Sequence, residues 1–273
     1  MANWSVSNIL SPTETLIQAI IQGITEWLPI SSSGHLVVLQ SYFLHQQPPL
    51  IFDVSLHVGT LCVVLVVFWE EIVRILGAVV RLDFESGEGR LALFIALGSI
   101  PTALIGYFFH DILESFFYNV LVVGVALLIN GLFLFLSERR EEGRELGILD
   151  SLLIGTAQGV AIIPGISRSG LTIATGLLRG VDKEAAFRYS FLLSVPAVMG
   201  AAISEFARLS ISSGVSINSP DLAIILSGIA VSMIIGYLSL KLLRKIVMQR
   251  KFHLFAYYCW TVGIIIIVNH PSV

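Results

Sequence analysis

Four side chains near the start of the chain have the types and spacing for covalent or acid–base chemistry. In "QGITEWLPISSSGHL" (22–36), His35 follows Ser32 by three residues, and Glu26 precedes Ser32 by six. A serine, a histidine and a carboxylate are the minimal set for nucleophilic or general-base catalysis. Gln22 lies one helical turn before Glu26, so both side chains project from one helix face. Because Ser-x-x-His is common by chance, this spacing favours catalysis without proving it.

A second polar segment, "PGISRSGLT" (164–172), interrupts another apolar run and contains Arg168 between Ser167 and Ser169. The planar guanidinium has donors that match phosphate oxygens, and Thr172, one turn later, adds a hydroxyl. Ser31 and Ser33 flank Ser32 in the first segment in the same way. We therefore expect these six groups, five hydroxyls and one guanidinium, to bind an anionic substrate together with Gln22.

The charges of the two segments leave alternatives open. Arg168 either binds substrate or forms a structural ion pair with Glu26. A carboxylate in lipid is neutral or paired, and the candidate partners of Glu26 are Arg168, a divalent cation or an exchangeable proton. Asp53 and His57, one turn apart, either line a cavity or lie at a membrane interface.

The elements that position these groups are membrane helices. Of 273 residues, 55% are hydrophobic and 13% charged, and the mean hydropathy is +0.87. This composition is typical of a polytopic membrane protein. Apolar runs long enough to cross about 30 Å of hydrocarbon lie near six ranges: 50–69, 91–109, 118–136, 187–207, 221–240 and 252–269.

Two further apolar regions, 13–40 and 148–178, are interrupted by the polar segments. Such breaks are tolerated at membrane depth only inside protein or beside a wet cavity, so we expect re-entrant helical hairpins. Most Lys and Arg residues fall in 70–90, 137–147, 179–188 and 241–251, which makes these stretches cytoplasmic. Both termini are then outside, and the hairpins enter the membrane from opposite faces.

The hairpins also resemble each other in sequence. "QGITEWLPISSSG" (22–34) aligns with "QGVAIIPGISRSG" (158–170) at a constant offset, with six identities. This predicts one integral membrane domain, 1–273, made of two inverted repeats, 1–136 and 137–273. Inverted repeats with broken helices place helix N-termini, which favour anions, near the bilayer midplane.

These motifs resemble the undecaprenyl-diphosphate phosphatase family, the bacitracin-resistance proteins of bacterial envelopes. The similarity covers essentially the whole chain and rests on "QGITEWLPISSSGH" and "PGISRSGLT". It implies a multi-pass hydrolase of the bacterial plasma membrane with an active site facing outward. The enzyme would convert undecaprenyl diphosphate to undecaprenyl phosphate, which recycles the lipid carrier for cell-wall synthesis and confers bacitracin resistance.

The resemblance also implies residue roles. It places the metal- and phosphate-handling carboxylate at Glu26, the nucleophile at Ser32, the catalytic histidine at His35 and the phosphate clamp at Arg168. It implies a divalent cation, Mg²⁺ or Ca²⁺. Many members of that family have glutamate where this chain has Gln22, so it stays open whether a metal site here has two carboxylates.

A transporter or flippase of polyprenyl phosphate lipid is the rival function, because inverted repeats with broken helices are a transporter architecture. A transporter needs no nucleophile and base, so Ser32 and His35 favour the enzyme. Nothing indicates a nucleic-acid partner; membrane lipids are expected neighbours, and the oligomeric state, a homodimer included, stays open.

Overall fold

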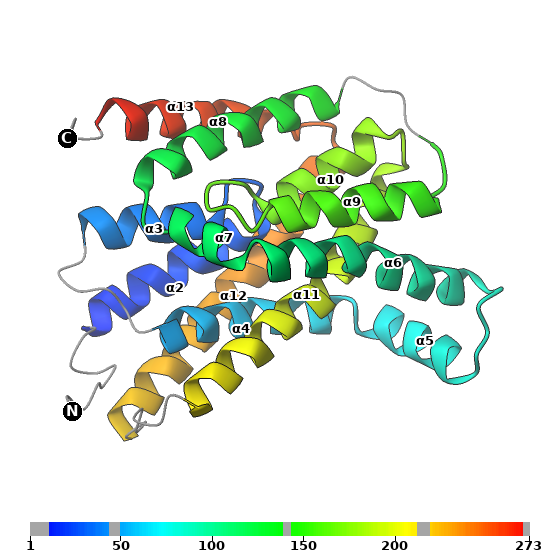
Figure 1. Cartoon of the computed structure of the whole chain (residues 1–273), viewed down its shortest axis with the longest axis horizontal. Helices are drawn as coiled ribbons and strands as arrows, with labels where there is room; N and C mark the ends of the chain where they lie inside the picture. Colours follow the sequence, from blue (N-terminus) through cyan, green and yellow to red (C-terminus); the bar gives the residue numbers. More distant parts are fainter. Residues whose placement is uncertain (1–10, 44–49, 139–142, 212–218, 270–273) are drawn as a thin grey trace.

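The computed structural model describes residues 11–43, 50–138, 143–211 and 219–269 (Figure 1). Within these ranges every regular element is a helix, and the one pairing of extended backbone is an isolated bridge between Arg144 and Val181. This confirms the predicted all-α class. The helices are α2 (Pro12–Trp27), α3 (Ser32–Tyr42), α4 (Leu50–Val67), α5 (Trp69–Val80), α6 (Gly87–Phe108), α7 (His110–Phe116), α8 (Val120–Ser137), α9 (Ile148–Val160), α10 (Arg168–Leu178), α11 (Lys183–Ile211), α12 (Ser219–Met248) and α13 (Leu254–Val268).

Four helices of the described chain are long and apolar enough to cross a membrane: α6, α8, the 183–204 part of α11 and the 222–248 part of α12. A fifth crossing is obtained if α4 and α5 count as one span, although they meet at a bend of 78°. α13 is apolar but has only 15 residues. The chain is therefore a multi-pass membrane protein by length and composition, with four or five strong spans instead of the six expected.

Two of the connections expected from the sequence contain helices. α5 lies in the basic stretch 70–90, and its exposed apolar side chains Trp69, Leu76 and Val80 share the helix with Arg74. α7 occupies most of the connection 110–117. α5 is amphipathic and too short to appear as an apolar span, and α7 is too short to give a periodic signal.

Both broken regions form helical hairpins with the expected bounds: α2 with α3, and α9 with α10. α3 and α10 have 11 residues each. At about 1.5 Å per residue, each covers roughly half of a ~30 Å hydrocarbon layer. Neither helix is long enough to cross a membrane alone, and each has the length expected of one arm of a re-entrant hairpin.

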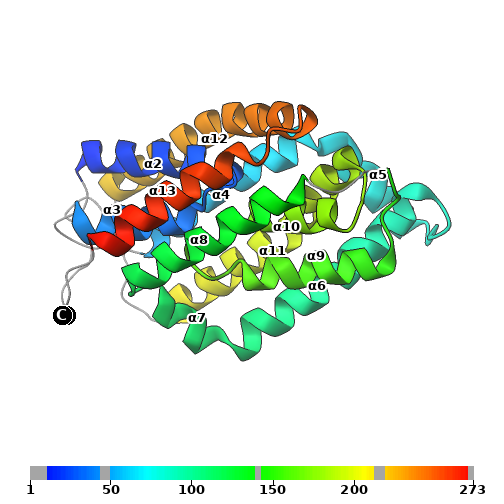
Figure 2. The same cartoon turned by 90° about the horizontal axis from the view of Figure 1, so that it is seen from above.

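The remaining helices enclose these hairpins. α2 packs along α12 and α9 packs along α6, while α8 packs against α13 and α10 (Figures 1 and 2). The main core joins residues from both hairpins and their neighbours, including Trp27, Leu127, Ile173, Phe187 and Phe191. This packing holds the loop 28–31 of the first hairpin against the loop 161–167 of the second.

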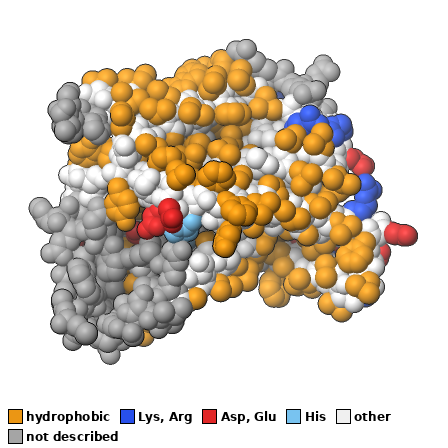
Figure 3. All heavy atoms as spheres, viewed as in Figure 1, with side chains coloured by type: hydrophobic (Ala, Val, Ile, Leu, Met, Phe, Trp, Pro, Cys, Tyr) orange, Lys and Arg blue, Asp and Glu red, His pale blue; other side chains and the backbone are white. Residues whose placement is uncertain are grey.

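The surface fits a lipid environment. Figure 3 shows hydrophobic side chains spread widely over the visible face outside the grey atoms, with Lys and Arg gathered at its right-hand end. Exposed apolar side chains are numerous on α6, α8, α12 and α13. Cys62 and Cys259 are both free thiols; Cys259 is buried and Cys62 is partly buried.

Candidate active site

The tips of the two hairpins are in direct contact. A methyl group added to Gly34 would lie 3.0 Å from both Cα and N of Gly165. The backbone N–H of Gly165 donates to Ser31 Oγ at 3.0 Å, and Ser169 Oγ donates to the carbonyl of Trp27 at 2.9 Å. Gly165 has φ of +100°, which favours glycine. The two polar segments therefore lie in direct contact and form one candidate site, as expected for two hairpins that meet inside the membrane.

The aligned serines cap the two short helices in the same way. Ser31 Oγ accepts from the backbone N–H of Gly34 at the start of α3, and Ser167 Oγ accepts from Gly170 N at the start of α10. Each cap serine also lies next to a second serine, with Oγ–Oγ distances of 3.3 Å to Ser33 and 3.2 Å to Ser169. Two helix N-termini, whose free N–H groups favour anions, consequently start at the hairpin tips.

Glu26, in the last turn of α2, is the centre of the site. Its side chain is 5% exposed, and Arg168 Nη2 donates to its Oε1 atom in an ion pair. Its Oε2 atom accepts from Ser32 Oγ at 2.6 Å and from Gln22 Nε2 at 3.0 Å. His57 Nε2 lies 3.6 Å from the same oxygen. The ion pair that the sequence left as an alternative is thus present in the site.

Arg168 is the first residue of α10, and its side chain is 17% exposed. Its guanidinium also lies 5.7 Å from the ring of Trp27, in a cation–π arrangement. Its Nη1 atom is buried and makes no hydrogen bond to the described residues. One donor of the fork therefore holds Glu26 while another is left for an incoming acceptor.

His35 faces away from the Ser32–Glu26 hydrogen bond. Its Nδ1 atom lies 2.7 Å from the carbonyl of Ser31, and its Nε2 atom lies 2.7 Å from the hydroxyl of Tyr258 on α13, whose ring stacks on the imidazole. The hydroxyl of Ser32 is instead bonded to Glu26. In this arrangement Glu26, not His35, is the base in contact with Ser32.

The other predicted binding residues lie in the same region. Thr172 is fully buried in α10, and its hydroxyl lies 2.5 Å from Ser190 Oγ on α11. Ser31, Ser167 and Ser169 are also buried, whereas Ser33 is partly exposed. The buried hydroxyls bond mainly to the protein itself, so they hold the two tips together in the arrangement observed.

Asp53 and His57 on α4 extend this polar region. Gln40 Nε2 donates to Asp53 Oδ2 at 3.1 Å and to Gln18 Oε1 at 3.3 Å. The Nδ1 atom of His57 lies 2.9 Å from the carbonyl of Asp53. Polar side chains of α2, α3 and α4 therefore continue beside Glu26, where Asp53 and His57 are both partly exposed.

Sequence reasoning missed Asn130, which is fully buried on α8 and joins both loops. Its Nδ2 atom donates to the carbonyl of Pro29 at 2.9 Å, and its Oδ1 atom accepts from the backbone N–H of Ser167 at 3.1 Å. A lone asparagine in the apolar run "VLVVGVALLINGLFLFL" (120–136) is a signal that could have identified it.

The side chains around Glu26 do not by themselves make a site for the divalent cation that the family resemblance implies. Within the described ranges, no three His, Cys, Asp or Glu side chains are grouped as cation ligands. Glu26 is the one carboxylate in contact with Arg168 and Ser32, and both of its oxygens already accept hydrogen bonds. Gln22 contributes an amide, which is a weaker ligand than a carboxylate.

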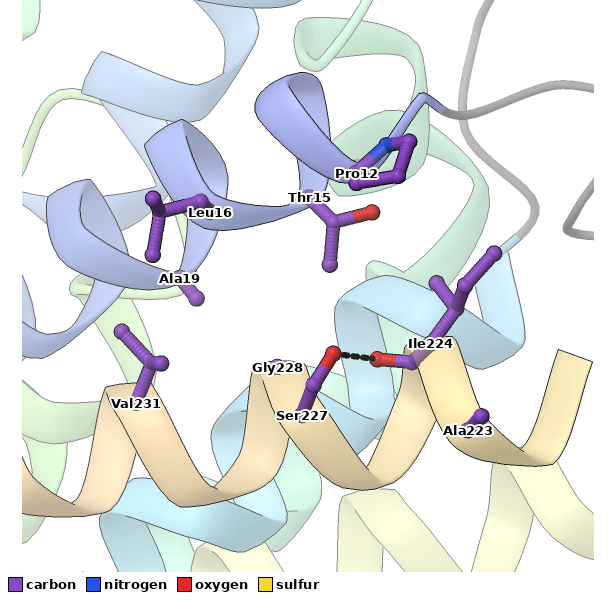
Figure 4. Close-up of a pocket in the computed structure, with 9 residues that line it drawn as sticks. All are labelled: Pro12, Thr15, Leu16, Ala19, Ala223, Ile224, Ser227, Gly228 and Val231. Atoms are coloured by element: carbon purple, nitrogen blue, oxygen red, sulfur yellow. Dashed lines mark hydrogen bonds between the residues drawn. The ribbon is translucent and has the colours of Figure 1, made fainter.

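A separate cavity of about 380 Å³ lies between α2 and α12 (Figure 4). Leu16 and Ala19 of α2 face Ile224 and Val231 of α12 across it. Because its lining is largely apolar, this cavity is unsuited to phosphate, and the hairpin tips remain the candidate active site.

Comparison with known proteins identifies the family. The family model described as "Bacitracin resistance protein BacA" matches residues 15–265. The chain belongs to this family. Proteins named undecaprenyl-diphosphatase are similar over nearly their whole length. The one from Carboxydothermus hydrogenoformans is 40% identical over 93% of this chain and 96% of that protein.

Two other relatives with the same name agree. The protein from Desulforapulum autotrophicum is 42% identical over 93% of this chain and 96% of its own. The one from Methanosphaera stadtmanae is 39% identical over 95% of this chain and 98% of its own. Both hairpin tips and the polar residues of α4 and α8 fall within the region matched by the BacA family model.

Proposed function

We propose that this chain is a membrane-embedded hydrolase that converts undecaprenyl diphosphate to undecaprenyl phosphate and inorganic phosphate. The observation that carries the proposal is the Ser32–Glu26–Arg168 contact at the hairpin tips. It combines a hydroxyl nucleophile, a carboxylate base and a guanidinium. Relatives named undecaprenyl-diphosphatase are similar to this chain over nearly their whole length. By this activity the protein would recycle the lipid carrier for cell-wall synthesis and confer bacitracin resistance.

In the proposed reaction, the terminal phosphate of the substrate lies between the N-termini of α3 and α10. Ser32 Oγ attacks the terminal phosphorus while its proton passes to Glu26 Oε2, to which it already donates. The bond from phosphorus to the bridging oxygen breaks, and undecaprenyl phosphate leaves. Water then cleaves the phosphoserine and releases inorganic phosphate. Arg168 and the helix N–H groups stabilise the charge, which is the main catalytic requirement of phosphoryl transfer.

His35 has a different place in this scheme from the one expected from spacing. Its contacts with Ser31 and Tyr258 support a role beside the nucleophile, in activating the water of the second step. In a competing version His35 activates water for direct attack, without a phosphoserine. The Ser32→Ala variant separates the two: near-wild-type hydrolysis by this variant would exclude the covalent route.

We place the site on the outer side of the membrane, with the two inverted repeats meeting near the midplane and the prenyl chain between helices. The support is the distribution of Lys and Arg, which assigns the ends of α5, α8, α10 and α12 to the cytoplasm. Right-side-out vesicles should then hydrolyse a short-chain polyprenyl diphosphate added outside. Activity only after permeabilisation would reverse the orientation.

The decisive experiment is phosphate release from a polyprenyl diphosphate by purified protein in detergent, with and without a chelator. We expect release by the wild type and loss in Arg168→Ala. Absence of release at any divalent-ion concentration would favour the rival, a transporter of polyprenyl phosphate lipid. Dimer formation and direct lipid partners belong to the same proposal and are tested by the mass of the purified particle and by its co-purifying lipids.

A further inference from the structure

We propose that the divalent cation of this enzyme binds only together with the diphosphate, because Arg168 and Gln22 occupy the carboxylate of Glu26 until substrate arrives. The inference rests on the proposed function, and it concerns the order in which charges enter the site. It assigns Gln22 a role beyond substrate contact: this amide prevents a resident cation site.

The first observation is that Glu26 has little capacity left for a cation. A carboxylate accepts at about four lone-pair positions. Arg168 occupies Oε1, while Ser32 and Gln22 both donate to Oε2. These three donors leave a single acceptor position on Oε1, next to the guanidinium of Arg168, so a cation that enters without substrate has one oxygen of Glu26 at most.

The second observation is the charge of the site. Glu26 and Arg168 form a buried pair whose formal charges cancel. A divalent cation placed beside this pair would meet the like charge of Arg168 with a single carboxylate to offset it. Hard cations bind through several oxygens, and their affinity rises with the number of charged ligands. One already paired carboxylate is a poor start for such a site.

The third observation is that two polar atoms at the same place lack partners. Arg168 Nη1 and Gln22 Oε1 are buried and make no hydrogen bond to the described residues. A diphosphate can take both the free donor and, by exchange, the Nη2 donor that now holds Glu26. The released Oε1 oxygen, Gln22 Oε1 and the phosphate oxygens together then supply the oxygen ligands that a divalent cation prefers.

This exchange makes the two ligands cooperative. Diphosphate draws Arg168 away from Glu26 and so frees a carboxylate oxygen for the cation. The cation would then occupy that oxygen, which keeps Arg168 on the phosphate. By linkage, each ligand must raise the affinity of the other by the same factor. A glutamate at position 22 would add a second carboxylate beside Glu26, so the same fold would hold a cation without substrate.

The test measures Mn²⁺ bound to purified protein without turnover, by equilibrium dialysis or electron paramagnetic resonance. In the absence of diphosphate we expect wild-type binding at or above about 1 mM, in the weakest range of protein cation sites. Gln22→Glu should tighten it by at least about tenfold, because it adds a charged ligand. Arg168→Gln should also tighten it, since it frees the Oε1 atom of Glu26 although it removes the phosphate clamp.

The chain provides a matched control in Gln158, which aligns with Gln22 but bonds to Thr102 Oγ1 and to the carbonyl of Leu193. Gln158→Glu adds the same charge at the repeat-related position, away from Glu26, and should leave Mn²⁺ binding at the wild-type level. Gln22→Glu combined with Glu26→Gln should lose the gain. Size-exclusion elution reports folding, and if Gln22→Glu misfolds, Arg168→Gln and Glu26→Gln still decide the question.

A second arm adds methylenediphosphonate, a non-hydrolysable diphosphate, and measures the Mn²⁺ that remains with the protein after desalting. We expect retention by the wild type and its loss in Glu26→Gln. Micromolar wild-type binding without the analogue, abolished by Glu26→Gln, would overturn the proposal. So would the absence of any gain in Arg168→Gln. Either result leaves phosphate release intact, whereas failure of the proposed hydrolysis would appear in the activity assay alone.

Discussion

Ser31 offers the sharpest test of how the hairpin tips are held. It is a non-glycine residue with φ of +69° and is 2% exposed. Its hydroxyl accepts from the N–H of Gly34 at 3.2 Å and from that of Gly165 at 3.0 Å. Alanine removes this acceptor, so both N–H groups lose their partner, and it keeps the strained backbone. Losing a helix cap costs about 1 kcal/mol, and leaving a buried N–H without a partner costs roughly 1–3 kcal/mol.

The Ser31→Ala variant should therefore lose about 2–4 kcal/mol. Ser31→Gly loses the same bonds but relieves a backbone strain of about 1–3 kcal/mol, against which glycine loses about 0.4–1 kcal/mol through the unfolded state. We expect glycine to be more stable than alanine here by roughly 1–2 kcal/mol, the reverse of the helix-interior order. The stabilities of the Ser31→Ala and Ser31→Gly variants differ because alanine and glycine differ in how well they tolerate the backbone conformation at position 31.

The assay is thermal unfolding of purified protein in one detergent at one heating rate. At roughly 2–4 °C per kcal/mol for a chain of this size, the midpoint of Ser31→Ala should fall by about 4–16 °C. Ser31→Gly should lie between that value and the wild type. An alanine variant as stable as the glycine variant would refute the strain, and two variants at the wild-type midpoint would refute the contact between the hairpins.

Three further changes test neighbouring contacts. Gly34→Ala places a methyl group 3.0 Å from Gly165, so the tips must separate, and phosphate release should fall by at least about tenfold because active-site geometry is exacting. Asp150→Ala removes a buried carboxylate that pairs with two arginines on the loop before α9 and the end of α10; its unfolding midpoint should fall, while that of the exposed neighbour Glu145→Ala should not. Asn130→Ala leaves a carbonyl and an N–H in the two loops without their partner, and both stability and activity should decrease, measured by the same melt and phosphate assay.

The location of the site was predictable because breaks in apolar runs have few explanations in a membrane. Proline, glycine and serine clusters at 28–34 and 164–170 interrupt the two apolar runs. α2 ends at Trp27 and α9 at Val160, ahead of these clusters, and each cluster contains the N-cap serine of the next helix. The number of strong spans was less predictable. α5 bends sharply from α4, and α13 is short, because packing against neighbouring helices sets these ends and hydropathy does not.

The hydrogen-bond partners within the site could not be predicted from the sequence, for a different reason. Spacing along one helix suggested that His35 would contact Ser32, since both belong to α3. The structure pairs His35 with Tyr258, 223 residues later, and Ser32 with Glu26 on the preceding helix. Serine and histidine each have several acceptable partners, so tertiary packing decides among them. Arg168 had fewer choices: a guanidinium in this apolar setting needs a carboxylate or an anionic ligand, and Glu26 is the carboxylate at the end of α2 in the facing hairpin. The sequence thus narrowed the partners of Arg168 to Glu26 or an anionic ligand, because burying an unpaired charge is costly. It left the partners of the neutral groups open, because these can exchange at little cost.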